Sequence, residues 1–422
     1  MRRLQLPCSA QLLLHAATCA CLAATGSGAE IVHSFLRTGW EPKRDTPRDL
    51  RHRLEPRWWT SCESAESSPG EDAVTLVTQA SLDRMPQLRA QLRAWQGPAS
   101  LALWLPAGFP PSASARKRVA EQMATASSIS TSACLVVGLL HGISAGETTA
   151  GSREADEQLY PINALRNLAL AQAATELVLL LDVDFVPSAA AAQLSASLRA
   201  HALLPQLLER HARTTQPHDS RYGRGDGGGT PAAVVLPAFE LKAHATERPR
   251  DKSNLTALWH TGGAQGFHID YIPSSHRPTN FSRWFALSAG AAPYAIDFHG
   301  HFEPYIVASR AWLPRYDTRF RGYGMNKVQH LHAVAARGAT LLVLPDVWVC
   351  ARPHAQSAAR LATVTTSAHP LQNLRVKYLF DVFRRDILPF NPFNQTAAGP
   401  RCAPCNMTPR KLPRLLMPPK PV

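Results

Sequence analysis

The sequence predicts an α/β fold with a mostly parallel central sheet. Short apolar runs that suit strands alternate with stretches of helical apolar spacing between residues 74 and 188, and this alternation is typical of parallel βαβ units. The apolar run Leu177–Leu181 leads directly into Asp182-Val-Asp184. Because ligands of open α/β sheets bind at the carboxyl ends of strands, this Rossmann-like pattern also indicates where a site would lie.

The first half of the expected domain alternates strand and helix. Val74–Thr78 is a short apolar strand, and apolar residues then recur every three or four positions over Leu82–Trp95. Gly97-Pro98 ends that helix. Further strands are expected at 101–105, 134–140 and 177–181, with helices at 116–124 and from Pro161, a residue that suits a first helical turn.

The second half is less regular. A helix is expected over 194–211, strands over 233–239 and 341–345, and a closing helix over 371–385. Residues 213–230 are polar and glycine-rich and indicate a loop. The segment 259–305 is dense in Gly, His, Pro and aromatic residues, a composition that favours site-forming loops over regular elements.

The two ends of the chain differ from this domain in composition. Arg2 and Arg3 precede a moderately apolar run, Cys8–Thr25, which is the pattern of a secretory signal peptide or a short signal anchor. We expect a leader over 1–28, a stem over 29–72, the α/β domain over 73–387 and a proline-rich basic tail over 388–422. Four glycosylation sequons begin at Asn254, Asn280, Asn394 and Asn406. They agree with a protein of the secretory pathway in the Golgi lumen, membrane-anchored if the leader is retained.

The distribution of the basic residues argues against nucleic acid as a partner. The chain has 45 Lys and Arg against 31 Asp and Glu, a formal net charge of +14. The basic residues are not interleaved with aromatic residues as a nucleic-acid surface requires, so no nucleic-acid partner is expected. Two interpretations remain, namely free use of arginine by a GC-rich genome and attraction to phosphate-bearing substrates or acidic glycans.

Cysteine pairing is left open by the sequence. Beyond the leader lie Cys62, Cys134, Cys350, Cys402 and Cys405, so at least one thiol is free or pairs between chains. Cys402 and Cys405 have the spacing of metal ligands, but no second pair completes a zinc site. A local disulfide in the tail, or no special role for the pair, is favoured over zinc.

Asp182 and Asp184 form the motif with the clearest chemistry. Side chains alternate along a strand, so both carboxylates lie on one side. Two hard oxygen ligands suit Mg²⁺ or Mn²⁺, with diphosphate oxygens completing the shell, whereas a plain strand-end turn is the alternative. Phosphohydrolases of the haloacid dehalogenase type also end a strand in Asp-x-Asp. They place it near the domain start and follow it with a small polar residue, whereas Phe185 follows here.

Seven segments share their sequence and their order with a known family. They are Val74-Thr-Leu-Val-Thr-Gln79, Tyr160-Pro-Ile-Asn-Ala-Leu-Arg-Asn167, Leu179-Leu-Leu-Asp-Val-Asp-Phe-Val-Pro-Ser188, Val235-Leu-Pro-Ala-Phe-Glu240, His276-Arg-Pro-Thr-Asn280 with Arg283-Trp284, Phe302-Glu-Pro-Tyr305 and Tyr316-Asp-Thr-Arg-Phe-Arg-Gly-Tyr-Gly-Met-Asn-Lys327. Across them the chain resembles glycosyltransferase family 49, the group of the LARGE-type glucuronyltransferase domains and the related β1,4-glucuronyltransferase. The resemblance implies a GT-A fold, a UDP-sugar donor, a divalent cofactor (usually Mn²⁺) and inversion at the anomeric carbon.

The resemblance also implies roles for particular residues. Asp182 and Asp184 match the family's metal- and diphosphate-binding pair. Thr78, Gln79 and Arg166 match positions near the nucleotide and donor sugar. A cationic Arg166 would offset diphosphate charge with forked hydrogen bonds, and a surface arginine on a helix is the alternative.

The segment expected to supply the third metal ligand departs from the family's pattern. Where the family usually reads His-x-Pro-His, this chain reads Ala351-Arg-Pro-His354. His354 is the remaining candidate, since imidazole suits Mn²⁺, and a loop histidine without a special role is the alternative. An alanine in the true ligand position would weaken metal binding or leave the position to water.

An inverting transfer needs a base for the acceptor hydroxyl, and Glu303 and Asp317 are the candidates. The apolar neighbours of Glu303 would desolvate it and raise its pKa, but a buried structural carboxylate fits the same pattern. Asp317 could equally cap a turn.

The acceptor-binding set is expected in the glycine-rich turn that follows Asp317. It comprises Tyr323, Gly324, Asn326 and Lys327. Glycine permits close approach of the backbone to a sugar, and Tyr323 is placed to stack on it or to serve in packing.

The sequence therefore predicts a metal-dependent inverting glycosyltransferase. It moves a sugar, with glucuronic acid favoured, from a UDP-sugar to a glycan or glycoprotein acceptor. Xylose, N-acetylglucosamine and galactose remain open as donor sugars, and the oligomeric state is not indicated. The alternative is a catalytically weak or inactive member of the fold that binds glycans, and Ala351 is the feature in its favour.

Overall fold

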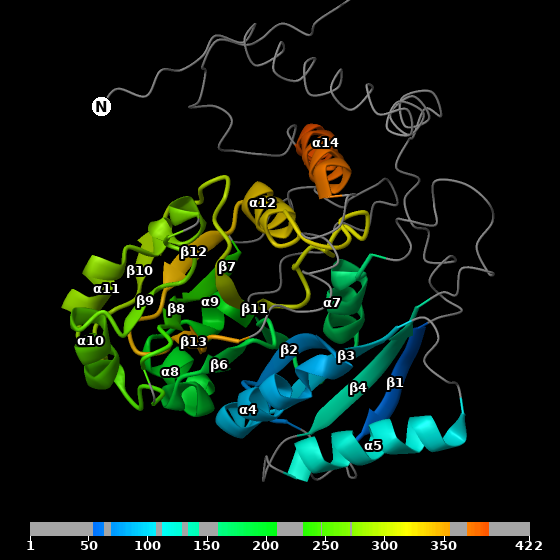
Figure 1. Cartoon of the computed structure of the whole chain (residues 1–422). Helices are drawn as coiled ribbons and strands as arrows, with labels where there is room; N and C mark the ends of the chain where they lie inside the picture. The colour runs from blue at the N-terminus through cyan, green and yellow to red at the C-terminus, as the bar shows by residue number, and fades with distance from the viewer. Residues whose placement is uncertain are drawn as a thin grey trace, which may run out of the picture.

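A nine-stranded sheet runs between two layers of helices (Figure 1). The computed structural model describes residues 54–62, 69–106, 112–128, 134–142, 159–208, 231–245, 247–270, 272–354 and 369–387. In spatial order the strands are β1 (Leu54–Thr60), β4 (Leu135–His141), β3 (Ala99–Leu105), β2 (Val74–Ser81), β5 (Leu177–Leu180), β11 (Tyr305–Ser309), β7 (Ala232–Leu236), β12 (Thr340–Val343) and β10 (Tyr294–Ile296). Strands β1, β11 and β10 run against their neighbours and the others share one direction. The predicted α/β class with a mostly parallel sheet is confirmed.

A second, four-stranded sheet continues two strands of the first. Its order is β6 (Phe185–Pro187), β13 (Val349–Ala351), β8 (Ala238–Leu241) and β9 (Ala264–Gly266). Strand β6 follows β5 after the two aspartates, and β8 follows β7 after Pro237. The single strand predicted over 233–239 is therefore divided at Pro237, because proline has no N–H for the ladder. The aspartate turn consequently lies where the two sheets meet.

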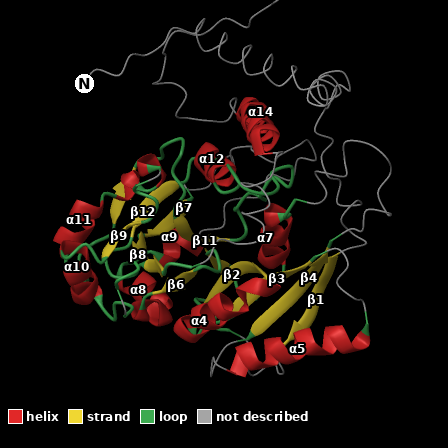
Figure 2. Cartoon of the chain, in the orientation of Figure 1, coloured by secondary structure: helices red, strands yellow, loops and turns green. Residues whose placement is uncertain are grey.

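The helices cover both faces of the large sheet. One face packs against α4 (Met85–Trp95), α5 (Ala113–Ser128), α8 (Leu194–Ala200) and α9 (Leu204–Leu208). The opposite face packs against α7 (Ile162–Ala171) and α12 (Val328–Ala336), whereas α10 (Lys252–His260) and α11 (Phe281–Ala286) pack on Phe239 of β8 in the second sheet. Figure 2 shows α7 and α5 on opposite sides of β3 and β4. The closing helix α14 (His369–Ile387) packs on α12.

The elements that the sequence did not predict include α12, β11 and β1. All nine residues of α12 are buried, so the sequence lacks the polar face that marks a surface helix. Strand β11 is short and begins at Tyr305, the last residue of the segment 259–305, which was expected to form loops but contains β9, α11 and β10. Strand β1 lies within the expected stem over 29–72, yet it pairs with β4 at the sheet edge. The helix predicted over 194–211 is interrupted between α8 and α9.

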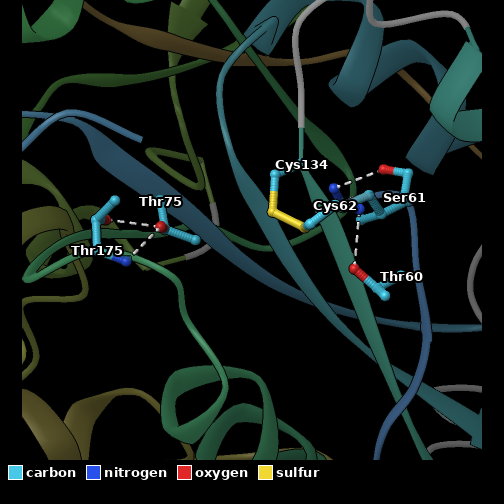
Figure 3. Close-up of a disulfide and its surroundings, with 7 residues drawn as sticks. Thr60, Ser61, Cys62, Thr75, Cys134 and Thr175 are labelled. Atoms are coloured by element: carbon cyan, nitrogen blue, oxygen red, sulfur yellow. Dashed lines mark hydrogen bonds between the residues drawn. A yellow bond between two sulfur atoms is a disulfide. The ribbon is translucent and has the colours of Figure 1, made fainter. Parts of the chain in front are cut away.

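A disulfide joins Cys62, just beyond β1, to Cys134, just before β4 (Figure 3). The Cys62 N–H donates to Thr60 Oγ1 at 3.0 Å. The same figure shows the hydroxyls of Thr75, in β2, and Thr175, just before β5, which lie 2.7 Å apart. The disulfide fixes the edge strand β1 onto the sheet.

Cys350, in β13, is a free and buried thiol. Burial raises the pKa of this thiol to about 12. It is therefore protonated at physiological pH and serves as a small apolar side chain in the core.

Several sequence predictions fall on the termini. The leader run Cys8–Thr25, the tail cysteines Cys402 and Cys405, and the sequons at Asn394 and Asn406 lie outside the described residues. Asn254 and Asn280 are exposed. Within the described ranges, no helix is both long enough and apolar enough to cross a membrane.

Candidate functional site

The turn between β5 and β6 holds Asp182 and Asp184 at the junction of the two sheets. The side chain of Gln91, which reaches in from α4, donates to the backbone carbonyls of Asp182 at 2.9 Å and of Phe185 at 2.8 Å. The Leu181 N–H donates to a carbonyl of β2 at 3.1 Å. Both ends of the turn are thus bonded to neighbouring elements, which fixes the direction of the two carboxylates.

Asp182 has three polar partners. Its carboxylate lies 2.6 Å from Arg166 Nη2 and 3.4 Å from Lys327 Nζ, and it accepts the Tyr305 hydroxyl at 3.1 Å. Burial alone would raise the pKa of Asp182, but Arg166 and Lys327 outweigh it and hold the pKa well below its usual range. Asp182 is therefore a stable anion among buried cations.

The negative charge of Asp184 has fewer close positive partners than that of Asp182. Its Oδ1 lies 3.3 Å from Arg84 Nη1, and its Oδ2 lies 3.7 Å from His354 Nε2. Oδ1 is buried and makes no hydrogen bond within the described part of the chain. Burial raises the pKa of Asp184 in spite of the nearby His354 and Arg84. A carboxylate with one oxygen buried in this way is stabilised by a further positive charge.

Arg166 is not the surface arginine that the sequence left as an alternative. It lies on α7 and is only 8% exposed. Its Nη1 donates to Asn163 Oδ1 at 3.2 Å, and its guanidinium lies 5.2 Å from the centre of the Tyr316 ring. Asn163 in turn donates to the carbonyl of Asp317 at 2.9 Å. Helix α7 thus places the Arg166 guanidinium beside the aspartate turn. Through Asn163 it also bonds to the start of the glycine-rich turn that follows Asp317.

Thr78 and Gln79, near the end of β2, lie beside this cluster. Together with Arg166 and Asp182 they line a pocket in the central part of the site. The Thr78 hydroxyl is buried and has no hydrogen-bond partner among the described residues, whereas Gln79 accepts the hydroxyl of Tyr160. An unpaired buried hydroxyl on a residue that lines this pocket suits a hydrogen bond to a ligand.

The two candidate bases are in different environments. Burial raises the pKa of Glu303, and the opposing charge of Lys327 reduces this effect. Asp317 is bound by its neighbour Arg319, whose Nε and Nη2 donate to it at 2.9 Å and 2.6 Å. It also accepts the Arg319 backbone N–H at 3.0 Å, so Asp317 makes the turn-capping bond that was its alternative interpretation.

The expected acceptor residues do not all face the same way. Tyr323 is 44% exposed. Gly324 has a φ of +110°, a conformation that favours glycine. Asn326 donates to a backbone carbonyl of the same turn at 2.9 Å. Lys327, in contrast, is 8% exposed, with its Nζ 3.8 Å from the centre of the Tyr305 ring. The structure therefore brings Lys327 to Asp182 and away from the exposed Tyr323.

The ligand atoms that this site offers suit a divalent cation. Asp182 and Asp184 offer carboxylate oxygens, and His354 offers an imidazole nitrogen. Over the described ranges, however, no three His, Cys, Asp or Glu side chains converge closely enough to hold a metal ion by themselves. Ala351, in β13, has no ligating side chain. Two carboxylates with one nearby imidazole are therefore the groups of the described chain that could contact a cation here, and ligand oxygens would have to complete its shell.

Sequence reasoning missed Arg84 and Tyr305 as site residues. Arg84 ends a short 3-10 turn, Leu82–Arg84, directly after β2, and Tyr305 begins β11. Arg84 could have been found from the sequence, because a charged residue just past the carboxyl end of a parallel strand lies where ligands bind. The contact of Tyr305 with Asp182 depends on β11 lying beside β5, which the sequence does not indicate.

Comparison with known proteins gives consistent matches. The sequence profile of the family described as "Glycosyl-transferase for dystroglycan" matches residues 109–368. Xylosyl- and glucuronyltransferase LARGE2 of Homo sapiens is 34% identical over 325 residues, covering 75% of this chain and 38% of that protein. For Xylosyl- and glucuronyltransferase LARGE1 of Homo sapiens the values are 30% over 294 residues, 69% and 33%. The chain thus spans less than two fifths of either relative.

Among solved structures, GalNAc-T7 with UDP, GalNAc and Mn²⁺ aligns with 78% of this chain and 57% of its own, at 11% identity and a TM-score of 0.36. A structure of S. aureus TarS in complex with UDP-GlcNAc aligns with 68% of this chain and 60% of its own, at 11% identity and a TM-score of 0.33.

Proposed function

The chain belongs to the glycosyltransferase family described as "Glycosyl-transferase for dystroglycan", and from this we propose that it is a metal-dependent inverting glycosyltransferase of the secretory pathway. Its fold is of the GT-A type. Its donor is a UDP-sugar, with glucuronic acid favoured, and its acceptor is a glycan or glycoprotein.

The observation that supports this proposal most directly is the cluster of buried cations. Arg84, Arg166 and Lys327 are each at most 8% exposed, and they surround the two carboxylates of Asp182 and Asp184. Buried charges are costly unless they are paired. A nucleoside diphosphate supplies its charge in the form that guanidinium groups bind best, and Arg84 and Arg166 both carry that group.

Each residue then has a role in the transfer. Asp182, Asp184 and His354 hold the divalent cation, which when bound neutralises charge on the leaving diphosphate. Arg166 and Lys327 bind the diphosphate and the donor sugar. This assignment moves Lys327 from the acceptor side, where the sequence put it, to the donor side.

Glu303 acts as the base. It accepts the proton of the acceptor hydroxyl while that oxygen forms its bond to the anomeric carbon. The bond from the same carbon to the diphosphate oxygen breaks on the opposite face, so the configuration inverts. Burial raises the pKa of Glu303, which makes it a stronger base than an exposed carboxylate. Asp317 is assigned a structural role, because Arg319 engages its carboxylate.

A donor screen tests the proposal. The purified protein is incubated with a series of UDP-sugars, and released UDP is measured with Mn²⁺ and with a chelator in its place. We expect turnover of at least one UDP-sugar, with UDP-glucuronic acid the best, and loss of turnover with the chelator. A protein that neither binds UDP nor turns over any UDP-sugar with Mn²⁺ present contradicts the enzyme assignment.

One observation favours the second candidate, a glycan-binding protein without activity. Ala351 brings no ligand to the site, and three protein ligands do not converge in the described part of the chain. This candidate gains support if the protein binds glycans in a titration but releases no UDP from any donor.

A further inference from the structure

Arg84 lies between two of the residues assigned to the metal. Its Nη1 is 3.3 Å from Asp184 Oδ1 and 3.1 Å from His354 Nδ1. Its Nε is 3.8 Å from the carboxylate of Asp83, its neighbour in the chain. Arg84 is 5% exposed, so its guanidinium is enclosed between the Asp184 carboxylate and the His354 ring.

A divalent cation and this guanidinium cannot share the same two partners. Both are positively charged, and in a buried site their repulsion is only weakly screened. Arginine has no acceptor atom, so it can only donate to His354 Nδ1. In the neutral ring the hydrogen then lies on Nε2, the nitrogen that faces Asp184 at 3.7 Å. A ring nitrogen that carries hydrogen has no lone pair for a metal.

The other two cations of the site differ from Arg84 in their partners. Arg166 and Lys327 both contact the Asp182 carboxylate, at 2.6 Å and 3.4 Å. Arg84 instead contacts Asp184 and His354 with one and the same nitrogen, Nη1. Its Nη1 therefore lies against two of the side chains that would hold the metal ion, next to Oδ1 of Asp184 and Nδ1 of His354.

We infer that Arg84 competes with the divalent cation for Asp184 and His354. In the donor-free protein the guanidinium occupies this position, and metal binding releases it towards the diphosphate, whose oxygens accept its forked hydrogen bonds. Metal and nucleotide therefore assist each other's binding. This inference rests on the proposed function, since it assigns a positioning residue to the same donor site.

The test is a Mn²⁺ titration of the full chain, with free Mn²⁺ followed by electron paramagnetic resonance, in the absence and presence of UDP. The variant R84Q removes the charge, and R84K keeps it. R93Q, at an exposed position of α4, is the matched control.

We expect R84Q to bind Mn²⁺ at least about tenfold more tightly than the wild type without UDP, and UDP to improve its Mn²⁺ affinity less than in the wild type. R84K stays closer to the wild type than R84Q does, and R93Q is unchanged. A Mn²⁺ affinity of R84Q that equals or falls below that of the wild type overturns the inference.

A measurement on the wild type keeps the inference testable if R84Q does not fold. Phenylglyoxal modifies accessible arginines, and peptide mass spectrometry reports the rate at Arg84. Mn²⁺ should raise that rate severalfold, and added UDP should lower it again. A rate that Mn²⁺ leaves unchanged overturns the inference. If the wild type binds no Mn²⁺ and releases no UDP from any UDP-sugar, the proposed function has failed instead.

Discussion

Arg166 Nη2 lies 2.6 Å from Asp182 Oδ1, and both side chains are largely withdrawn from solvent. This contact joins α7 to the turn after β5, two elements that meet only in the folded chain. The pair therefore supports both the local fold and the charge of the site, and the two contributions can be separated by mutation.

Arg166→Met should destabilise the fold by about 3 kcal/mol, because it leaves the half-buried Asp182 carboxylate without its closest partner. Urea unfolding measures the loss. The double variant Arg166→Met with Asp182→Asn should recover part of it, since the uncompensated charge is then gone. Strictly additive losses in the double variant would show that the two residues are not coupled.

Asp184→Asn should abolish turnover and leave the thermal melt near that of the wild type. Burial already raises the pKa of Asp184, so replacing the carboxylate with a neutral amide of the same shape costs the fold little. Turnover is measured as UDP released from the best donor, and the melt by circular dichroism. A large loss of thermal stability would mark Asp184 as a structural residue.

Glu303→Gln should lower kcat by about 10² to 10⁴-fold while the affinity for UDP stays within a few-fold, because only the proton acceptor is removed. Asp317→Asn serves as the comparison. It loses charge-assisted bonds from Arg319, so it should lower stability more than kcat. The reverse pattern in the two variants would transfer the role of base to Asp317.

His330 should make the fold sensitive to acid. Its ring is fully buried, stacks on Tyr316 at 3.8 Å, and has Nε2 3.0 Å from the Pro314 carbonyl. Burial lowers the pKa of His330 to about 3 from an ordinary value of 6.5. Between these values the unfolded chain binds a proton that the folded chain does not. This contribution to stability is thus complete above pH 6.5 and is lost as the pH falls towards 3.

The His330→Gln variant isolates this effect. Its unfolding free energy should fall less steeply with acid than that of the wild type, by up to about 1.4 kcal/mol per pH unit. Urea unfolding at several values between about pH 7.5 and 4.5, a range that brackets the ordinary pKa of histidine, gives both slopes. His260→Gln, at an exposed position, should keep the wild-type slope. Equal slopes for His330→Gln and the wild type would contradict the prediction.

Replacing both Cys62 and Cys134 with serine should reduce stability by about 4 kcal/mol, since the disulfide joins residues separated by 72 positions. Turnover of the folded variant should remain, because the bond joins β1 and β4 at the edge of the sheet, away from the aspartate turn. Urea unfolding and UDP release measure the two quantities. An unchanged unfolding midpoint would show that β1 does not depend on the bond.

The sequence by itself determined the local features of this protein. The apolar run before Asp182 and Asp184 indicated a buried strand that ends in a site, and the alternation of short strands with amphipathic helices indicated the α/β class. The predictions of the strand and of the α/β class are confirmed, because strand and helix periodicity is set within a few residues of each position. The family motifs added the expectation of a nucleotide-sugar site.

Only the tertiary structure decided which side chains meet at that site. Arg84, Lys327 and His354 come from three segments far apart in the chain, and their distances to the aspartates depend on how the two sheets join. The same holds for β11, which lies between β5 and β7 and brings Tyr305 to Asp182. Contacts of this kind arise from long-range packing, which local periodicity does not encode. The aspartate pair was therefore predictable, whereas the arrangement of the cations around it was found only in the folded chain.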